Sequence, residues 1–159
     1  MIRASLIIKK LRQELGPDGF EFIWSGQHYS DNMKDVFFRQ LGVEAPDVEL
    51  TTDTKSDQST IGTLISNLGQ HWQEKRPDAA VFLGDTNTVC GSLAAASQNI
   101  PIVHIEGCMR SYDWRMPEEK YRTAIDHLSD VIYAYVEEYK LQGITEGIRP
   151  QNIVVTGNP

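Results

Sequence analysis

Four short apolar segments, separated by stretches with helical character, constrain the fold of this chain most strongly. They span residues 79–83, 101–105, 131–135 and 153–156. Their residues do not alternate between apolar and polar, which is typical of strands buried on both faces. Strands that alternate with helices in this way predict a parallel sheet with helices on both faces. We therefore expect a single doubly wound α/β domain over residues 1–159.

The remaining elements follow the same alternation. Helical spacing of apolar residues predicts helices over residues 2–15 and 59–75, and turn residues separate them from strands at 20–25 and 47–51. Further helices are expected from about residue 30 to 41, from the loop at 84–88 to 98, and over 117–128 and 137–142. The chain opens on a helix and closes on a strand and loop, whereas such domains normally open on a strand. This order suggests a fragment of a longer protein.

Composition excludes several classes of function. A net charge of −7 argues against nucleic acid or an anionic membrane surface as the main partner. No apolar run approaches the ~20 residues that a membrane helix needs. The amino terminus carries charges within its apolar stretch, unlike a secretory signal. The two cysteines, Cys90 and Cys108, are read as reduced thiols of a cytoplasmic protein.

The loops at the carboxyl ends of the predicted strands carry the candidate chemistry, because these loops share one crevice in a doubly wound sheet. The segment from His104 to Arg122 is the most crowded, with a buried strand, a charged loop and a helix that begins near Pro117. Carboxylates converging on one crevice suit general acid and base catalysis. The crevice candidates are Gln27, His28, Asp85, Asn87, residues 106–115, Glu118 and Asn158.

Each candidate also has an ordinary structural interpretation. Asp85 could cap the helix that follows it. Glu118 and Arg122 are four residues apart, which favours a solvated ion pair on a helix face. His104 and His127 are expected to make structural hydrogen bonds, because no second ligand stands at metal-binding spacing. Cys108 would need a base partner and a lowered pKa to act as a nucleophile, which we do not favour. The residues alone therefore predict an α/β domain with an acidic crevice.

Five groups of residues, in order along the chain, add a resemblance to a known family. They are residues 25–30 with 33, 35–38, 41 and 42; residues 84–88; residues 104–107 with 109–111; residues 116–119 with 122, 126 and 127; and residues 156–159. Together they resemble the motifs of the non-hydrolysing UDP-N-acetylglucosamine 2-epimerases. At residues 107–109 the chain has Gly-Cys-Met where that family usually has Ala-Gly-Leu.

The resemblance implies the amino-terminal half of a glycosyltransferase-B-type fold, whose active site lies between two Rossmann-like domains. It implies that Asp85, Glu106 and Glu118 are catalytic and that Arg122 holds or tunes them. Arg3, which aligns with a common Lys of the family, and Gln27, His28 and Asn158 are the other expected substrate contacts. The implied reaction inverts carbon 2 of UDP-N-acetylglucosamine, without a metal or nicotinamide cofactor, to supply surface polysaccharides.

The same resemblance implies a homodimer at full length and an inactive isolated chain, because the carboxy-terminal domain contributes most UDP contacts. Three alternatives remain: an epimerase of a modified UDP-sugar, a hydrolysing 2-epimerase that releases free N-acetylmannosamine, and a noncatalytic sugar-nucleotide-binding domain. The family's first strand would precede residue 1 and lie centrally in the strand order 3-2-1-4-5-6. Without it we expect a gap in the sheet, a collapse of its neighbours onto each other, or a borrowed segment.

Overall fold

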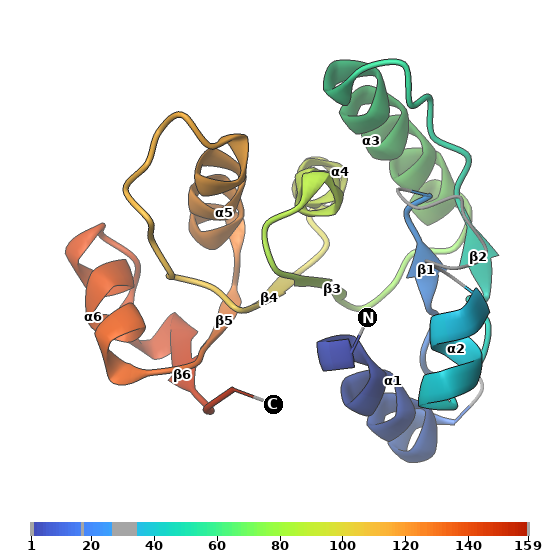
Figure 1. The fold of residues 1–159 in the computed structure, drawn as a ribbon, viewed down its shortest axis with the longest axis horizontal. Coiled ribbons are helices and arrows are strands. Elements are labelled where there is room, and N and C mark those ends of the chain that lie inside the picture. The colour runs from blue at the N-terminus through green and yellow to red at the C-terminus, as the bar shows by residue number, and fades with distance from the viewer. Residues whose placement is uncertain (1, 17, 27–34, 159) are drawn as a thin grey trace.

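The computed structural model describes residues 2–16, 18–26 and 35–158, and within these the side chains of residues 2, 3 and 35–37 are not described. Helices and strands alternate along the chain, as predicted (Figure 1). In order they are α1 (Ile2–Leu15), β1 (Ile23–Trp24), α2 (Asp35–Leu41), β2 (Val48–Glu49), α3 (Asp57–Glu74), β3 (Ala80–Leu83), η2 (Asn87–Gly91), α4 (Ser92–Ser97), β4 (Ile102–Ile105), α5 (Pro117–Leu128), β5 (Val131–Ala134), α6 (Glu137–Thr145), η3 (Pro150–Asn152) and β6 (Ile153–Val155).

The strands form two separate parallel sheets. One has the order β1-β2, and the other has the order β3-β4-β5-β6. Ala80 lies opposite Ile102, and Val103 lies opposite Val131, so the four-stranded sheet keeps an unbroken register. Over the described residues no pairing joins β1 to β3. The prediction of a parallel α/β fold is confirmed, and the described strands β1 and β3 have not collapsed into one sheet.

Local sequence signals explain where the longest helices begin. Ser56 caps α3 by accepting a hydrogen bond from the backbone N–H of Ser59 at 3.1 Å. Pro117 occupies the first turn of α5, and Glu118 and Glu119 place negative charge at its positive end. The Ala-rich helix begins differently from the prediction, because its first turn is the 3₁₀ helix η2.

Three apolar clusters form the core. The first joins α3, β3, η2, α4, β4 and α5 around Leu64, Phe82 and Ile125, and Ile23 of β1 packs against it. The second lies around Ile132 and Ile153, where α6 covers β5 and β6. The third packs α1 and α2 against β1. In the described part of the chain, no helix combines the length and the apolar character needed to cross a membrane.

Candidate functional site

Arg122 joins two of the three predicted catalytic carboxylates at the carboxyl ends of the strands. Asp85 follows β3 and Glu106 follows β4, while Arg122 lies on α5. The Nη2 atom of Arg122 is 2.7 Å from Oδ2 of Asp85 and 3.7 Å from Oε1 of Glu106. The side chain of Arg122 is 6% exposed, whereas that of Asp85 is 32% exposed. One nearly buried cation therefore holds two carboxylates from neighbouring strands, and one of them reaches solvent.

Glu106 is fixed by its own backbone as well as by Arg122. Its backbone N–H donates to the carbonyl of Tyr133 at 3.0 Å, and its φ of 76° lies in the left-handed region. A non-glycine residue in this region is strained and is held there by its surroundings. The hydroxyl of Tyr135 donates to Oε2 of Glu106 at 3.0 Å. This left-handed turn directs the carboxylate toward Arg122 at the end of β4.

The two structural alternatives for these residues are wrong. Asp85 does not cap the following helix, because Thr86 occupies the cap position of η2 and makes no side-chain cap hydrogen bond. Arg122 pairs with Asp85 and Glu106, and no ion pair links it to Glu118 among the described residues. Glu118 is half-buried in the first turn of α5. It lies on the same helix as Arg122 but outside the ion-pair cluster.

A buried polar network lies beside this cluster. The Nδ1 atom of His104 is 2.7 Å from Oδ1 of Asp126, and its Nε2 atom is 2.8 Å from the carbonyl oxygen of Gly84. Each ring nitrogen of His104 therefore lies within hydrogen-bond distance of an oxygen atom. The structural hydrogen bonds predicted for His104 are confirmed. Through them His104 joins the loop of Asp85 to α5.

Asp126 also anchors the loop that follows Glu106. Its Oδ2 atom accepts from the backbone N–H of Cys108 at 2.9 Å and from Nη1 of Arg110 at 2.7 Å. Arg110 donates two further hydrogen bonds to Glu146, the C-cap residue of α6, at 2.9 and 2.6 Å. Burial alone would lower the pKa of Arg110, but Glu146 and Asp126 outweigh it and raise that pKa. The loop is thus tied to both α5 and α6 by a side chain that stays charged.

Gly107 is required by close packing in the same loop. A Cβ atom at this position would lie 2.3 Å from Cγ2 of Ile132 and 2.6 Å from Oδ1 of Asp126. Both distances are shorter than any normal contact, so a larger residue would displace the network or the β5 core. Glycine permits this close approach because it carries no Cβ atom.

Glu119 also holds the loop after β4 in place, and the sequence did not reveal this role. Its carboxylate accepts from the backbone N–H groups of Ser111, at 3.0 Å, and Tyr112, at 2.8 Å, and from the hydroxyl of Ser111. Burial opposes its ionisation, but these hydrogen bonds outweigh burial and lower the pKa of Glu119. Its place at the third position of α5, where helix-capping glutamates occur, was the signal that could have identified it.

The two thiols and His127 carry no catalytic signal. Burial, with the nearby Asp126, raises the pKa of Cys108 to about 12, so its thiol stays protonated at neutral pH. Burial likewise raises the pKa of Cys90 to about 11. His127 is half-exposed, and its Nε2 atom lies 3.9 Å from Glu146. Across the described ranges, no three His, Cys, Asp or Glu side chains are arranged to hold a metal ion.

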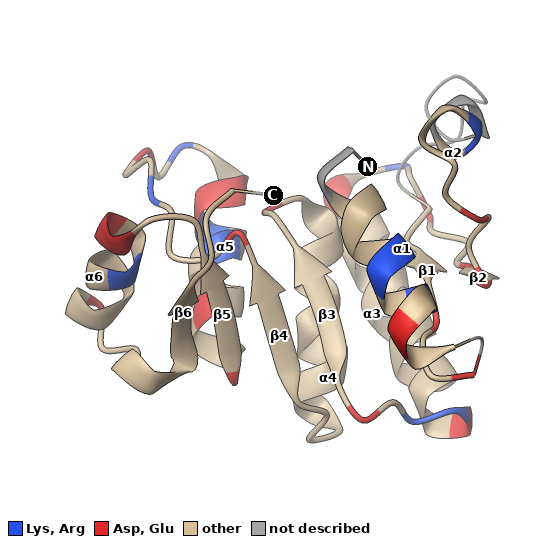
Figure 2. Cartoon of the chain, turned by 90° about the horizontal axis from the view of Figure 1, so that it is seen from below, with Lys and Arg blue, Asp and Glu red and all other residues tan. Residues whose placement is uncertain are grey.

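The other predicted substrate contacts are not gathered around Arg122 by the described part of the structure. Gln27 and His28 lie outside the described residues, as does the side chain of Arg3. Asn158 is exposed beyond β6. Acidic and basic residues lie close together on the ribbon at the end of α5 beside the carboxyl ends of β4 and β5 (Figure 2).

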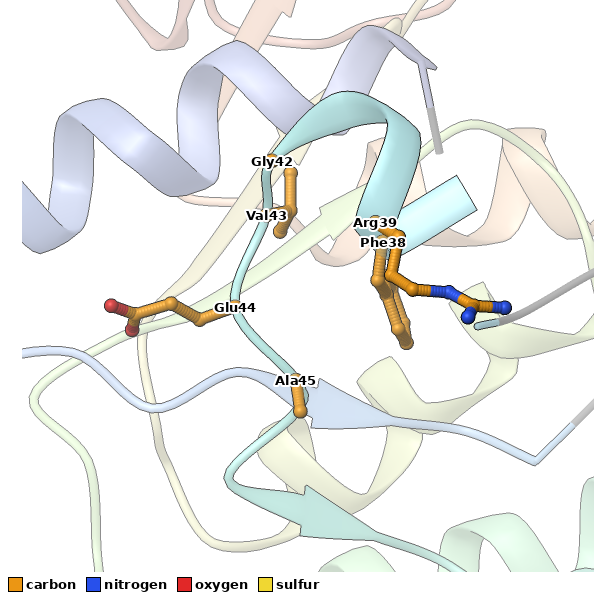
Figure 3. Close-up of a pocket in the computed structure, with 6 residues that line it drawn as sticks. All are labelled: Phe38, Arg39, Gly42, Val43, Glu44 and Ala45. Atoms are coloured by element: carbon orange, nitrogen blue, oxygen red, sulfur yellow. The ribbon is translucent and has the colours of Figure 1, made fainter. Parts of the chain in front are cut away.

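Two surface hollows lie away from the Arg122 cluster. One has a volume of about 620 Å³ and lies at the end of α2, where Arg39 and Glu44 point in opposite directions (Figure 3). The other has a volume of about 410 Å³ and lies over the loop of residues 110–114. Neither is lined by Asp85, Glu106, Glu118 or Arg122. The candidate site therefore lies outside both of these hollows.

Comparisons with known proteins agree on one family. The family model described as UDP-N-acetylglucosamine 2-epimerase matches residues 14–159. A UDP-N-acetylglucosamine 2-epimerase of Methanococcus maripaludis is 35% identical over 159 residues, covering 99% of this chain and 42% of the relative. A UDP-2,3-diacetamido-2,3-dideoxy-D-glucuronate 2-epimerase of Pseudomonas aeruginosa is 33% identical over 133 residues, covering 83% of this chain and 37% of the relative.

A solved structure gives the same result. The crystal structure of Methanocaldococcus jannaschii UDP-GlcNAc 2-epimerase in complex with UDP-GlcNAc and UDP superposes with a TM-score of 0.93 at 34% identity. The match covers 99% of this chain and 43% of that structure. The chain thus spans less than half the length of the relatives that it matches.

Proposed function

The chain belongs to the UDP-N-acetylglucosamine 2-epimerase family, and we propose that it is the amino-terminal domain of an enzyme that epimerises UDP-N-acetylglucosamine at carbon 2. The product of this reaction is UDP-N-acetylmannosamine. The observation that carries the proposal is the position of Arg122, 2.7 Å from Asp85 and 3.7 Å from Glu106. Two carboxylates from adjacent strand ends, held by one cation, are groups of the kind that an epimerisation by proton transfer uses.

The chemistry follows from the substrate. No carbonyl group flanks carbon 2 of the sugar, so its hydrogen cannot be removed by enolisation. Instead a base takes the proton from carbon 2 while the bond between carbon 1 and the UDP oxygen breaks. UDP leaves with the electron pair of that bond, and a double bond forms between carbons 1 and 2. An acid then protonates carbon 2 from the opposite face, and the UDP oxygen attacks carbon 1 again.

Asp85, Glu106 and Glu118 are the proposed acid and base groups. Asp85 is the most exposed side chain of the Arg122 cluster and is accessible to a sugar at the rim. Glu106 is held by both Arg122 and Tyr135, which suits a group that must keep a fixed direction. Glu118 lies on α5 outside this cluster, so it would act from another direction. A reaction that uses both faces of a ring requires such a separation.

The leaving diphosphate needs cations and backbone N–H groups around it. We propose that the rest of the full-length protein supplies most of them, together with Arg3, Gln27, His28 and Asn158 of this chain. The isolated chain is then expected to be inactive, and the full-length protein is expected to be a cytoplasmic homodimer. Turnover of UDP-N-acetylglucosamine by the purified 159-residue chain would contradict this division of the site.

A chimera tests the proposal directly. Residues 1–159 would replace the matching part of the Methanococcus maripaludis relative, which shares 35% identity with them. Proton NMR of UDP-N-acetylglucosamine in D₂O should then show UDP-N-acetylmannosamine, with deuterium at carbon 2 of both sugars. Deuterium at carbon 2 reports the proton removal itself. A folded chimera that binds UDP but forms no product would favour a noncatalytic sugar-nucleotide-binding domain.

Single substitutions in the chimera test the residues. Asp85→Asn, Glu106→Gln and Glu118→Gln are each expected to lower kcat by about 10²-fold or more, because each removes a group that transfers or directs a proton. Glu138→Gln changes an exposed carboxylate on α6 and serves as the matched control. If one of the three site variants matches this control in kcat, that residue has no catalytic role.

A modified UDP-sugar is the second candidate substrate, and the 33% identity with the Pseudomonas aeruginosa diacetamido-glucuronate epimerase supports testing it. The chimera would be assayed with both sugars, and the ratio of their kcat/KM values identifies the preferred one. Mass spectrometry of the products separates the third possibility, because a hydrolysing enzyme releases free N-acetylmannosamine and UDP.

A further inference from the structure

Glu106 lies between two different donors at the ends of neighbouring strands. It directly follows β4, and Tyr135 directly follows β5, the next strand of the sheet. The hydroxyl of Tyr135 donates to Oε2 of Glu106 at 3.0 Å, whereas Nη2 of Arg122 is 3.7 Å from Oε1. The first distance is that of a hydrogen bond, and the second is too long for one. Glu106 is therefore hydrogen-bonded to the neutral hydroxyl, and its contact with the Arg122 cation is an ion pair without a hydrogen bond.

Arg122 has a donor that this arrangement leaves unused. Its side chain is 6% exposed, and its buried Nε–H group has no hydrogen-bond partner in the described part of the chain. The Nε and Nη2 atoms of a guanidinium present two N–H groups side by side, a fork that can bind both oxygens of one carboxylate. A buried donor without a partner costs free energy, so a nearby carboxylate would gain from closing on this fork.

The side chain of Glu106, rather than its backbone, decides which donors its carboxylate meets. The backbone is held by the hydrogen bond from its N–H to the carbonyl of Tyr133 at 3.0 Å. Glu106 and Tyr135 are each 9% exposed, so water competes little for the contact between them. A bidentate pair with Arg122 requires both oxygens to move toward the guanidinium. The hydroxyl of Tyr135 holds Oε2 in place and therefore opposes this movement.

We propose that Tyr135 is a positioning residue that keeps Glu106 out of a bidentate pair with Arg122. This role rests on the proposed epimerase function, in which Glu106 transfers or directs a proton. A carboxylate that gives both oxygens to a guanidinium is a poorer proton acceptor, because the cation stabilises its charged form. By donating one neutral hydrogen bond, Tyr135 fixes the direction of Glu106 and leaves its other oxygen for chemistry. Tyr135 thus acts through Glu106 and not on the substrate.

NMR of the 159-residue chain tests the geometry without an assay of activity. Tyr135→Phe removes the hydroxyl and keeps the ring, so Glu106 should close on Nε of Arg122. Exchange of the Arg122 Nε–H with water should then slow by about tenfold or more, the factor expected for a hydrogen bond to a charged group. Tyr139→Phe is the matched control, because it makes the same change at a partly buried tyrosine of α6 that packs in the second apolar cluster.

The same two substitutions in the chimera test the consequence for catalysis. Tyr135→Phe should lower kcat by about tenfold or more while KM changes by less than about twofold, because the direction of Glu106 changes and substrate binding does not. Tyr139→Phe should leave both constants unchanged. A double variant with Tyr135→Phe and Glu106→Gln should have the kcat of Glu106→Gln alone, because Tyr135 acts only through Glu106.

Three results would overturn the proposal. A kcat of Tyr135→Phe equal to that of Tyr139→Phe would show that the hydroxyl does not position Glu106. Unchanged exchange at Nε of Arg122 in the Tyr135→Phe chain would show that Glu106 does not close on the guanidinium. A double variant slower than Glu106→Gln alone would show that Tyr135 acts on the substrate directly. A chimera that is inactive with all of these residues unaltered contradicts the epimerase function instead, and the NMR measurement still decides whether Tyr135 holds Glu106 away from Arg122.

Discussion

The four-stranded and two-stranded sheets of this chain are held in different ways. The first contains a fully buried polar network, in which the side chains of Asp126 and His104 are 0% exposed. The second relies on aromatic packing, with the rings of Phe22, Trp24 and Phe38 in edge contacts 5.4 to 6.4 Å apart. Its ion pairs lie nearer the surface, such as that between Glu21 and the exposed Lys75.

The four-stranded sheet holds the residues of the candidate site in place, whereas the two-stranded sheet contributes to the fold without holding that site. A buried polar network leaves few alternative arrangements, because every unpaired member costs free energy. It therefore fixes the loops of Asp85 and Glu106 even though β1 and β3 are not paired. Apolar packing is less directional, and the two-stranded sheet depends on α3, which packs against both sheets. Four substitution experiments test this comparison.

The largest effect is expected from Asp126→Ala. This change leaves His104, Arg110 and the N–H of Cys108 without their common acceptor in a buried setting. We expect the free energy of unfolding, measured by urea denaturation, to fall by about 3–5 kcal/mol. The control is Asp113→Ala, which removes a surface pair with Arg115 and should leave the free energy of unfolding almost unchanged. Equal losses would show that the network does not dominate the four-stranded half.

Gly107→Ala should have the next largest effect. The new methyl group would overlap Ile132 and Asp126, and overpacking of this kind costs about 1–3 kcal/mol. Gly62→Ala is the matched control, because its Cβ meets no atom within 4 Å on the exposed side of α3. There the change should stabilise the protein by about 0.5–1 kcal/mol, since alanine favours the helix. Thermal unfolding should therefore shift in opposite directions for the two variants.

Ser56→Ala tests the helix that supports both sheets. Loss of its hydrogen bond to the N–H of Ser59 should reduce the free energy of unfolding by about 1 kcal/mol. Ser56→Asp restores an acceptor at the same position and should recover most of the loss. If the aspartate variant is as unstable as the alanine variant, the cap is not the source of the effect.

Local features of the sequence predicted local features of the structure well. The helix expected over residues 117–128 has those bounds, because Pro117 and the acidic first turn mark its start. The strand expected over residues 20–25 is only Ile23–Trp24, since it pairs on one side with the equally short β2. Whether the sheet would close, separate or borrow a strand depended on long-range packing, which no local pattern reports.

Prediction of the candidate site from the sequence had the same limit. Helical spacing placed Glu118 and Arg122 on one helix face, but it could not show that Asp85 and Glu106 lie across from Arg122. Asp126 appeared in the sequence only as part of a family motif, and no role was predicted for it, because its partners lie on β4 and in the loop that follows. Side-chain partners brought together by the fold are visible only once the strands are in place. The role of Glu119 was easier to predict than that of Asp126, because its position in the first turn of α5 is itself a sequence signal.

The smallest effect concerns the contact that joins the two halves directly. The hydroxyl groups of Ser25 and Thr88 are 2.8 Å apart and connect the loop after β1 to η2. A double-mutant cycle with Ser25→Ala and Thr88→Val should give a coupling free energy of about 0.5–1 kcal/mol, the usual net value of one hydrogen bond. Coupling above that range would mean that this contact, and not α3 alone, sets the spacing of the sheets. Zero coupling, with Ser56→Ala still destabilising, would assign the connection between the halves to α3 and its apolar side.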